Sequence, residues 1–219
     1  MSGKTQLLRL LSWLSPAFPV GAFAYSHGLE RAIHDGVVAG RAELIDWIID
    51  LVERGSGWND AVLLAEAWRT AGCDGGAGAA ELAAAMAGSK ERHMEATLQG
   101  TAFAEAVRAW TPIRHGGEPR DLPYPVAVGL AAAGGGVDLD AALAAYLHAF
   151  TSNLVQAALR LVPLGQSDGV ATLAALEPVI LEQAARASAS TLDDLGGCTV
   201  LSDIASMKHE TQYSRVFRS

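Results

Sequence analysis

Two histidines and a glutamate near the N-terminus have the residue types and spacing for metal chemistry. Glu30 follows His27 by three residues and precedes His34 by four. On a helix, this spacing places all three side chains on one face. Imidazole and carboxylate ligands together suit a borderline divalent ion such as nickel or zinc. The alternative is a polar helix face with one glutamate–histidine contact. We favour this alternative because polar faces are common on helices.

The remaining reactive side chains give little support for catalysis. On a helix, the adjacent residues His209 and Glu210 would point about 100° apart, which makes a poor metal site. An exposed hydrogen-bonding role at an interface is the better interpretation of this pair. Cys73 and Cys198 have no neighbouring base in the sequence, so neither is expected to be a nucleophile. The sequence therefore predicts a protein that is not an enzyme, with no catalytic residues, resident metal or cofactor.

The final segment, 206–219, is dense in side chains that bind other proteins. Chain ends are usually frayed and tolerant of change, but this one contains neither glycine nor proline. Spaced aromatic and arginine side chains are typical anchors at protein interfaces. A frayed tail of chance composition is the alternative. The residues expected to bind a partner are Met207, Lys208, His209, Glu210, Tyr213, Arg215, Phe217 and Arg218.

A rigid turn near the N-terminus is a second candidate for docking. Phe18 stands between Pro16 and Pro19 in the stretch Ser15–Gly21. Proline fixes the backbone angle φ, and Gly21 leaves the chain free to enter the next helix. The turn connects two helices, and it could also present the Phe18 ring to a partner.

Composition excludes several classes of protein. Half of the 219 residues are apolar and 18% are charged, which is typical of a globular chain. The net charge of −8 argues against non-specific binding to nucleic acid or an anionic membrane. The uncharged run 10–26 resembles a secretory signal, but two prolines interrupt it and it is too short to span a membrane.

The spacing of apolar residues is helical along nearly the whole chain. Leu143, Leu147, Phe150 and Leu154 begin a single stripe that continues over about five turns. Pro178 interrupts another helical pattern and should kink the helix or start a new segment. No segment alternates between apolar and polar residues as a strand would. We expect an all-α, bundle-like domain of roughly eight to ten helices over 1–195, followed by a C-terminal arm over 196–219.

Three stretches carry a resemblance to a known family. They are SPAFPVGAFAYSHGLE at 15–30, RLVPLGQSDG at 160–169 and HETQYSRVFRS at 209–219. Together they closely resemble the urease accessory protein UreF family, and they lie near the start, three quarters along and at the end of the chain. Phe18, Tyr25 and Glu30 belong to the first stretch, which makes them candidates for partner binding.

The resemblance implies a non-enzymatic assembly factor in the cytoplasm. UreF-like proteins form a complex with UreD/UreH and the GTPase UreG, which promotes nickel insertion into apo-urease. By this resemblance, the C-terminal arm would bind UreD/UreH, a helical surface would recruit UreG, and the chain would form a homodimer. Two alternatives stay open: a small metal-dependent enzyme or nickel metallochaperone using His27, Glu30 and His34, and a helical binding module whose partner is unknown.

Overall fold

The chain folds into a layered bundle of helices. The computed structural model describes residues 2–113, 115 and 122–218. Among these residues there is no strand, which confirms the expected all-α class. The α-helices are α1 (Gly3–Trp13), α2 (Leu29–His34), α3 (Arg41–Arg54), α4 (Ser56–Thr70), α5 (Ala77–Ala85), α6 (Lys90–Val107), α7 (Tyr124–Gly134), α8 (Leu139–Leu161), α9 (Gln166–Ser188) and α10 (Val200–His209). The described residues also form the short 3₁₀ helices η1 (Ala22–Ala24) and η3 (Leu192–Asp194).

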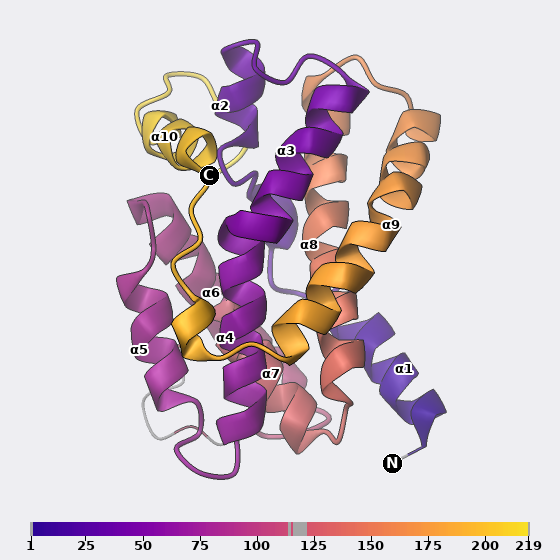
Figure 1. Cartoon of the computed structure of the whole chain (residues 1–219), viewed down its shortest axis with the longest axis vertical. Helices are drawn as coiled ribbons and strands as arrows, with labels where there is room; N and C mark the ends of the chain where they lie inside the picture. The colour runs from indigo at the N-terminus through magenta and orange to yellow at the C-terminus, as the bar shows by residue number, and fades with distance from the viewer. Residues whose placement is uncertain (1, 114, 116–121, 219) are drawn as a thin grey trace.

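Helix α4 lies at the centre of the bundle, in contact with α3, α7, α8 and α9 (Figure 1). The apolar stripes predicted from the sequence face this core. Leu143, Leu147 and Leu154 of α8 are fully buried, as are Leu44 and Ile48 of α3. Burial of such leucine and isoleucine side chains stabilises the fold by about 2 kcal/mol each.

The contact between α4 and α7 is close because small residues line it. A Cβ atom added to Gly129 of α7 would lie 2.4 Å from the carbonyl oxygen of Leu64 on α4. No side chain fits into that space, so glycine is required for the two helices to approach this closely. Ala61 and Ala65 of α4 and Ala131 of α7 are also buried in the core.

Pro178 does not start a new segment, contrary to one of the two expected outcomes. Helix α9 continues through it from Gln166 to Ser188. Proline removes one backbone hydrogen bond and crowds the preceding turn. Buried contacts of Leu176 and Ile180, on either side of the proline, hold the helix against the core.

The C-terminal part of the chain returns to the bundle. The indole Nε1 of Trp58 on α4 donates to the carbonyl oxygen of Asp194 at 2.9 Å, and the amide of Asn59 donates to that of Gly197 at 2.9 Å. Helix α10 then packs beside α2 at the upper end of the molecule in Figure 1, far from α1. The segment expected to form an arm therefore lies against the domain. The boundary at residue 195 stays a prediction.

Helix α1 lies along the outside of the bundle, next to the end of α7. Arg9 donates to the carbonyl oxygen of Gly135 at 2.6 Å, and Gln6 donates to that of Gly136 at 2.8 Å. Trp13 is buried, whereas Leu8 and Leu11 are more than half exposed. Across the described residues, no helix combines the length and the apolar character needed to cross a bilayer.

Candidate functional site

The carboxylate of Glu30 holds the C-terminal tail, residues 210–218, against the body of the protein. Glu30 lies in the first turn of α2 and is only 5% exposed. Its Oε1 accepts a hydrogen bond from the backbone N–H of Val216 at 2.7 Å, and its Oε2 accepts one from Phe217 at 2.8 Å. A buried carboxylate needs such donors to offset its loss of water. Hydrogen bonds to an ionised acceptor are also stronger than neutral ones.

His209 joins the same carboxylate to a second one. Its imidazole is fully buried, with Nε2 at 3.1 Å from Glu30 Oε2 and Nδ1 at 2.8 Å from Glu91 Oε2. Ionised carboxylates only accept hydrogen bonds, so both contacts are made when both ring nitrogens carry protons. Arg215 donates to the other oxygen of Glu91 at 2.5 Å. Two tail-side residues and two acidic residues of the body therefore form one ionic network.

Phe217 fills the last anchoring position. Its side chain is 4% exposed, and the Arg160 guanidinium at the end of α8 lies 5.9 Å from the centre of its ring. The next residue, Arg218, donates its backbone N–H to the carbonyl oxygen of Ala24 at 2.7 Å. The tail therefore contacts α2, α6, α8 and η1. A segment with this many anchors has little freedom to move as an independent arm.

Gly28 lets α10 approach α2. Its φ of +77° lies in the left-handed region that favours glycine. A Cβ atom at this position would lie 2.8 Å from the backbone nitrogen of Ser206 and 2.9 Å from the carbonyl oxygen of Ser202. Ser206 also bonds to Ser89, the N-cap of α6, at 2.9 Å between the hydroxyl oxygens. The stretch that contains Gly28 and Glu30 is thus the receptor for the C-terminal segment.

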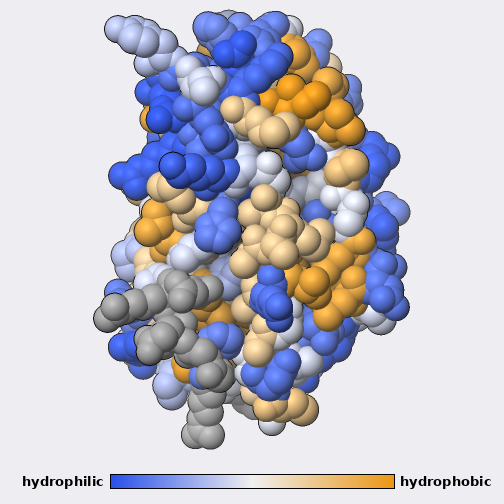
Figure 2. All heavy atoms as spheres, turned by 90° about the vertical axis from the view of Figure 1, so that its left-hand side faces the viewer, coloured by the Kyte–Doolittle hydropathy of each residue, from blue (hydrophilic) through white to orange (hydrophobic). Residues whose placement is uncertain are grey.

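Most of the remaining predicted anchors are exposed, whereas Glu210 is half-buried and accepts a hydrogen bond from the backbone N–H of Lys90. Tyr213 is fully exposed and Met207 is 49% exposed, while Lys208, Arg215 and Arg218 are also exposed. Apolar side chains of α10 extend this face, including Leu201 and Ile204. We call the exposed set the docking face: Leu201, Ile204, Met207, Lys208, Tyr213 and Val216. Figure 2 shows hydrophobic patches among hydrophilic atoms on the side that carries α5 and α10.

Several candidates are placed differently from the expectation. Phe18 is 9% exposed and packs against Phe103 and Trp110, with ring centroids 5.5 and 6.2 Å away, so its ring is not presented to solvent. His209 does not have the exposed hydrogen-bonding role expected of it, because its imidazole is fully buried and both ring nitrogens contact carboxylates of the body. Tyr25 is buried, and this burial raises its pKa although a hydrogen bond from Arg218 opposes the shift.

The metal-site candidates do not come together. His27 precedes α2 and has a left-handed φ of +52°, so it does not share a helix face with Glu30. Its Nε2 lies 3.0 Å from Glu95 of α6, whereas Glu30 contacts His209 and His34 is exposed. In the part of the chain that the structure describes, no group of three or more histidine, cysteine or acidic side chains could hold a metal ion.

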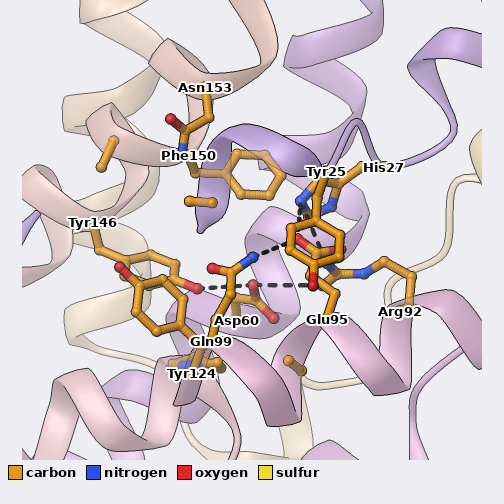
Figure 3. A pocket seen from close by; sticks show the side chains of 14 residues that line it. Tyr25, His27, Asp60, Arg92, Glu95, Gln99, Tyr124, Tyr146, Phe150 and Asn153 are labelled. Carbon is orange, nitrogen blue, oxygen red and sulfur yellow. Dashed lines mark hydrogen bonds and ion pairs between the residues drawn. The ribbon is translucent and has the colours of Figure 1, made fainter. Parts of the chain in front are cut away.

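Sequence reasoning missed a buried ionic cluster between α4, α6 and α8 (Figure 3). Arg92 lies 2.6 Å from Glu95 and 3.7 Å from Asp60, measured between nitrogen and oxygen. The Tyr146 hydroxyl donates to Asp60 at 2.9 Å, and His27 completes the cluster. The only signal in the sequence was the spacing of three residues between Arg92 and Glu95, which is common on helix surfaces.

The surroundings shift the pKa values of the two acids in this cluster, Glu95 and Asp60, in opposite directions. Burial disfavours the charge of Glu95, but Arg92 and His27 overcome that effect and lower the pKa of Glu95 to about 2. For Asp60, burial outweighs Arg92 and raises the pKa. The adjoining cavity has a volume of about 40 Å³, room for about three water molecules at roughly 10–15 Å³ each. The cluster fixes α6 against α4 and α8, and α6 in turn supplies Glu91 to the tail.

A serine motif also escaped the sequence reasoning. Gly165, Ser167 and Gly169 have the Gly-x-Ser-x-Gly spacing of hydrolase nucleophiles. In those enzymes the serine follows a strand and meets a histidine. Here the motif begins α9, and Asp168 accepts from the backbone N–H of Gly165 at 2.9 Å. Ser167 is exposed, and no bond joins it to a histidine among the described residues. The motif is therefore a helix start.

Known proteins resemble this chain along nearly its whole length. The UreF family model matches residues 38–177. A urease accessory protein UreF 1 of Brucella canis is 59% identical over 217 residues, which cover 98% of this chain and 95% of the relative. A urease accessory protein UreF of Mesorhizobium japonicum is 58% identical over 214 residues, covering 97% and 96%.

This chain belongs to the UreF family. Family membership confirms the resemblance found in the three sequence stretches. UreF proteins are urease accessory proteins rather than enzymes, in agreement with the weak catalytic signals in the sequence. The family model ends before α10, whereas the similarity to the two full-length relatives covers nearly the whole chain.

Proposed function

We propose that this protein is an assembly factor that acts with UreD/UreH and the GTPase UreG to promote GTP-dependent nickel insertion into apo-urease. In this proposal the protein works in the cytoplasm, as a homodimer, by presenting surfaces to other proteins. UreD/UreH binds the docking face, and a separate helical surface recruits UreG. Membership of the UreF family supports the urease part of this function.

The observation that carries the proposal is the division of the C-terminal segment into anchors and exposed side chains. His209 and Phe217 are buried against the body, whereas Tyr213 and Met207 project from it. Tyrosine is enriched among the residues that dominate binding energy at interfaces. The exposed side chains therefore have the chemistry of a binding surface, and the buried ones hold that surface in place.

This arrangement reduces the entropic cost of binding. A free arm would have to become ordered when it meets its partner, which weakens the affinity. Here the ionic network of Glu30, His209 and Glu91 has already ordered the segment. Preorganised surfaces bind more tightly because fewer side chains and backbone angles are fixed on association. The docking face is thus a rigid platform rather than a clasp.

The exposed face of α1 is the surface best suited to be the interface of the proposed homodimer. Leu8 and Leu11 form an exposed apolar ridge, which adjoins a groove of about 590 Å³ between α1 and α8. Small side chains of α8, including Ala141 and Ala145, line this groove. A ridge beside a groove on one patch is self-complementary under a twofold axis, as an isologous dimer requires.

Urease maturation tests the proposed function. Cells that produce apo-urease, UreD/UreH and UreG but lack this protein should show little urease activity, and the wild-type chain should restore it. The double variant Met207→Ala, Tyr213→Ala should restore much less at equal protein level. A matched control is Val170→Ala, Leu181→Ala, which shortens two exposed side chains of α9. Full urease activity without the protein would contradict the proposal.

A further inference from the structure

A cleft beside the docking face has the charges to receive an anion. Its volume is about 380 Å³, and it lies between the tail and the first turns of α6. Three cationic side chains line it, from Lys90, Arg215 and Arg218, together with the carboxylates of Glu91 and Glu210. The cleft is therefore a local exception in a chain whose net charge is −8.

The two carboxylates in the cleft already have partners. Glu91 accepts from Arg215 and contacts His209, and the Oε1 of Glu210 accepts from the backbone N–H of Lys90 at 2.9 Å. The Lys90 ammonium and the Arg218 guanidinium form no ion pair with any residue that the structure describes; Arg218 has only a hydrogen bond to a tyrosine, Tyr25. Two cations thus remain for a carboxylate that comes from outside.

Exposed apolar residues lie at the cleft and beside its lining residues in the chain, and we call them its rim. Met94 lines the cleft and is 48% exposed, and so is Leu98, one turn further along α6. Val216, between the lining residues Arg215 and Phe217, is 68% exposed. Phe23, next to the residue whose carbonyl holds Arg218, is 61% exposed. An acidic side chain flanked by apolar residues in a protein segment fits both the cations and this rim. A phosphate group would bring a second negative charge close to Glu91 and Glu210.

We propose that this cleft binds an aspartate or glutamate side chain of UreD/UreH. The inference rests on the proposed function, and it names the contact that orients the partner on the docking face. The cleft adjoins that face because Arg215 and Phe217, which line the cleft, are the two chain neighbours of Val216. Charged contacts at the edge of an interface mainly set specificity and the rate of association. The cations therefore fix the position and orientation in which UreD/UreH binds the docking face.

Charge reversal at Lys90 tests the cleft directly. The affinity of the full-length protein for UreD/UreH is measured at low and moderate salt for wild type, Lys90→Glu and Arg218→Gln. Lys90 is the first residue of α6, where a glutamate suits the helix dipole and leaves the fold intact. Arg41→Glu is the matched control, because Arg41 is an exposed cation at the first position of α3. We expect Lys90→Glu to weaken binding about tenfold at low salt, with a smaller loss at moderate salt.

The possible outcomes separate the cleft from the proposed function. The cleft proposal holds if Lys90→Glu and Arg218→Gln both weaken binding while Arg41→Glu binds as wild type. It is overturned if both cleft variants bind within twofold of wild type while Met207→Ala, Tyr213→Ala binds weakly, a result that would leave the proposed function intact. Wild-type protein that does not bind UreD/UreH at all would overturn both.

Discussion

The Oε2 atom of Glu30 lies 3.1 Å from the Nε2 atom of His209, although 179 positions separate the two residues in the chain. This contact joins α2 to the end of α10 in the interior of the protein. Because Glu30 also accepts from the backbone of Val216 and Phe217, one carboxylate holds both the end of α10 and the last turn of the tail. The docking face depends on these contacts.

Replacing the Glu30 carboxylate should release the tail. In Glu30→Gln, the amide has only one acceptor oxygen, so at least one buried donor loses its partner at a cost of roughly 1–3 kcal/mol. Hydrogen exchange of the Val216 and Phe217 amides should be faster than in wild type by about tenfold or more. Glu182→Gln on α9 is exposed and serves as the control. Unchanged protection of both amides in Glu30→Gln would contradict the anchoring role.

A methyl group at Gly28 should separate α10 from α2. Gly28 and Gly36 have nearly equal φ values of +77° and +75°, so alanine strains the backbone similarly at both sites, by about 1 kcal/mol. Only at Gly28 would the new Cβ meet another helix, 2.8 Å from the Ser206 nitrogen. We expect Gly28→Ala to lower the free energy of unfolding by about 1–3 kcal/mol more than Gly36→Ala. Equal values in urea denaturation would show that the contact is unimportant.

Much of the architecture could be predicted from the sequence because it follows from local periodicity. The buried stripe of Leu143, Leu147 and Leu154 on α8 confirms the helical spacing. The docking of the tail could not be predicted in this way. Glu30 and His209 give no local signal of their contact, and a polar terminal segment looks the same whether it is docked or free. Whether the tail docks depends on the acidic residues Glu30 and Glu91, which lie close to it in space but far from it in the chain.

The buried ionic cluster and the burial of Phe18 also could not be predicted, because both depend on contacts between residues that are distant in the chain. Asp60, Arg92 and Tyr146 come from three helices, and each alone resembles an ordinary surface or core residue in the sequence. Phe18 looks like an exposed anchor between its prolines, yet the ring of Phe103 lies 5.5 Å away and covers it. Tertiary contacts of this kind leave no trace in helical periodicity, so sequence reasoning missed both.

The ionic cluster should make stability depend on acid pH. The pKa of Glu95 is lowered to about 2 in the folded protein, compared with about 4.3 for an unperturbed glutamate. Its ionic contribution is therefore fully present above pH 4.3 and is lost as the pH falls toward 2, about 3 kcal/mol in total. Asp60 acts in the opposite sense, because its raised pKa favours the protonated form in the folded state.

Urea denaturation of wild type and Glu95→Gln at several pH values tests whether the stabilisation by ionised Glu95 is lost as the pH falls. We expect the difference in unfolding free energy to be largest near pH 7 and to shrink steadily below pH 4. Asp60→Asn provides the comparison, because it removes a buried carboxylate whose charge is disfavoured and should cost less than Glu95→Gln at pH 7. A constant difference for Glu95→Gln from pH 7 to pH 3 would contradict the charged pairing of Glu95.

The exposed ridge of α1 gives a test of the homodimer. Leu8→Asp and Leu11→Asp place a charge on a surface that becomes buried in the proposed dimer, where an unpaired charge costs several kcal/mol. Analytical ultracentrifugation should therefore show a monomer for either variant under conditions where wild type is dimeric. Val170→Asp is the control, since Val170 is 69% exposed on α9. Dimers of equal stability in Leu8→Asp and Val170→Asp would place the interface elsewhere.

The affinity of the full-length protein for purified UreD/UreH tests the central claim most directly. Met207→Ala, Tyr213→Ala removes two exposed side chains of the docking face and leaves the buried anchors His209 and Phe217 in place. We predict that binding weakens at least about tenfold, with an unchanged far-UV spectrum and unchanged protection of the Phe217 amide. Binding within twofold of wild type would contradict the account.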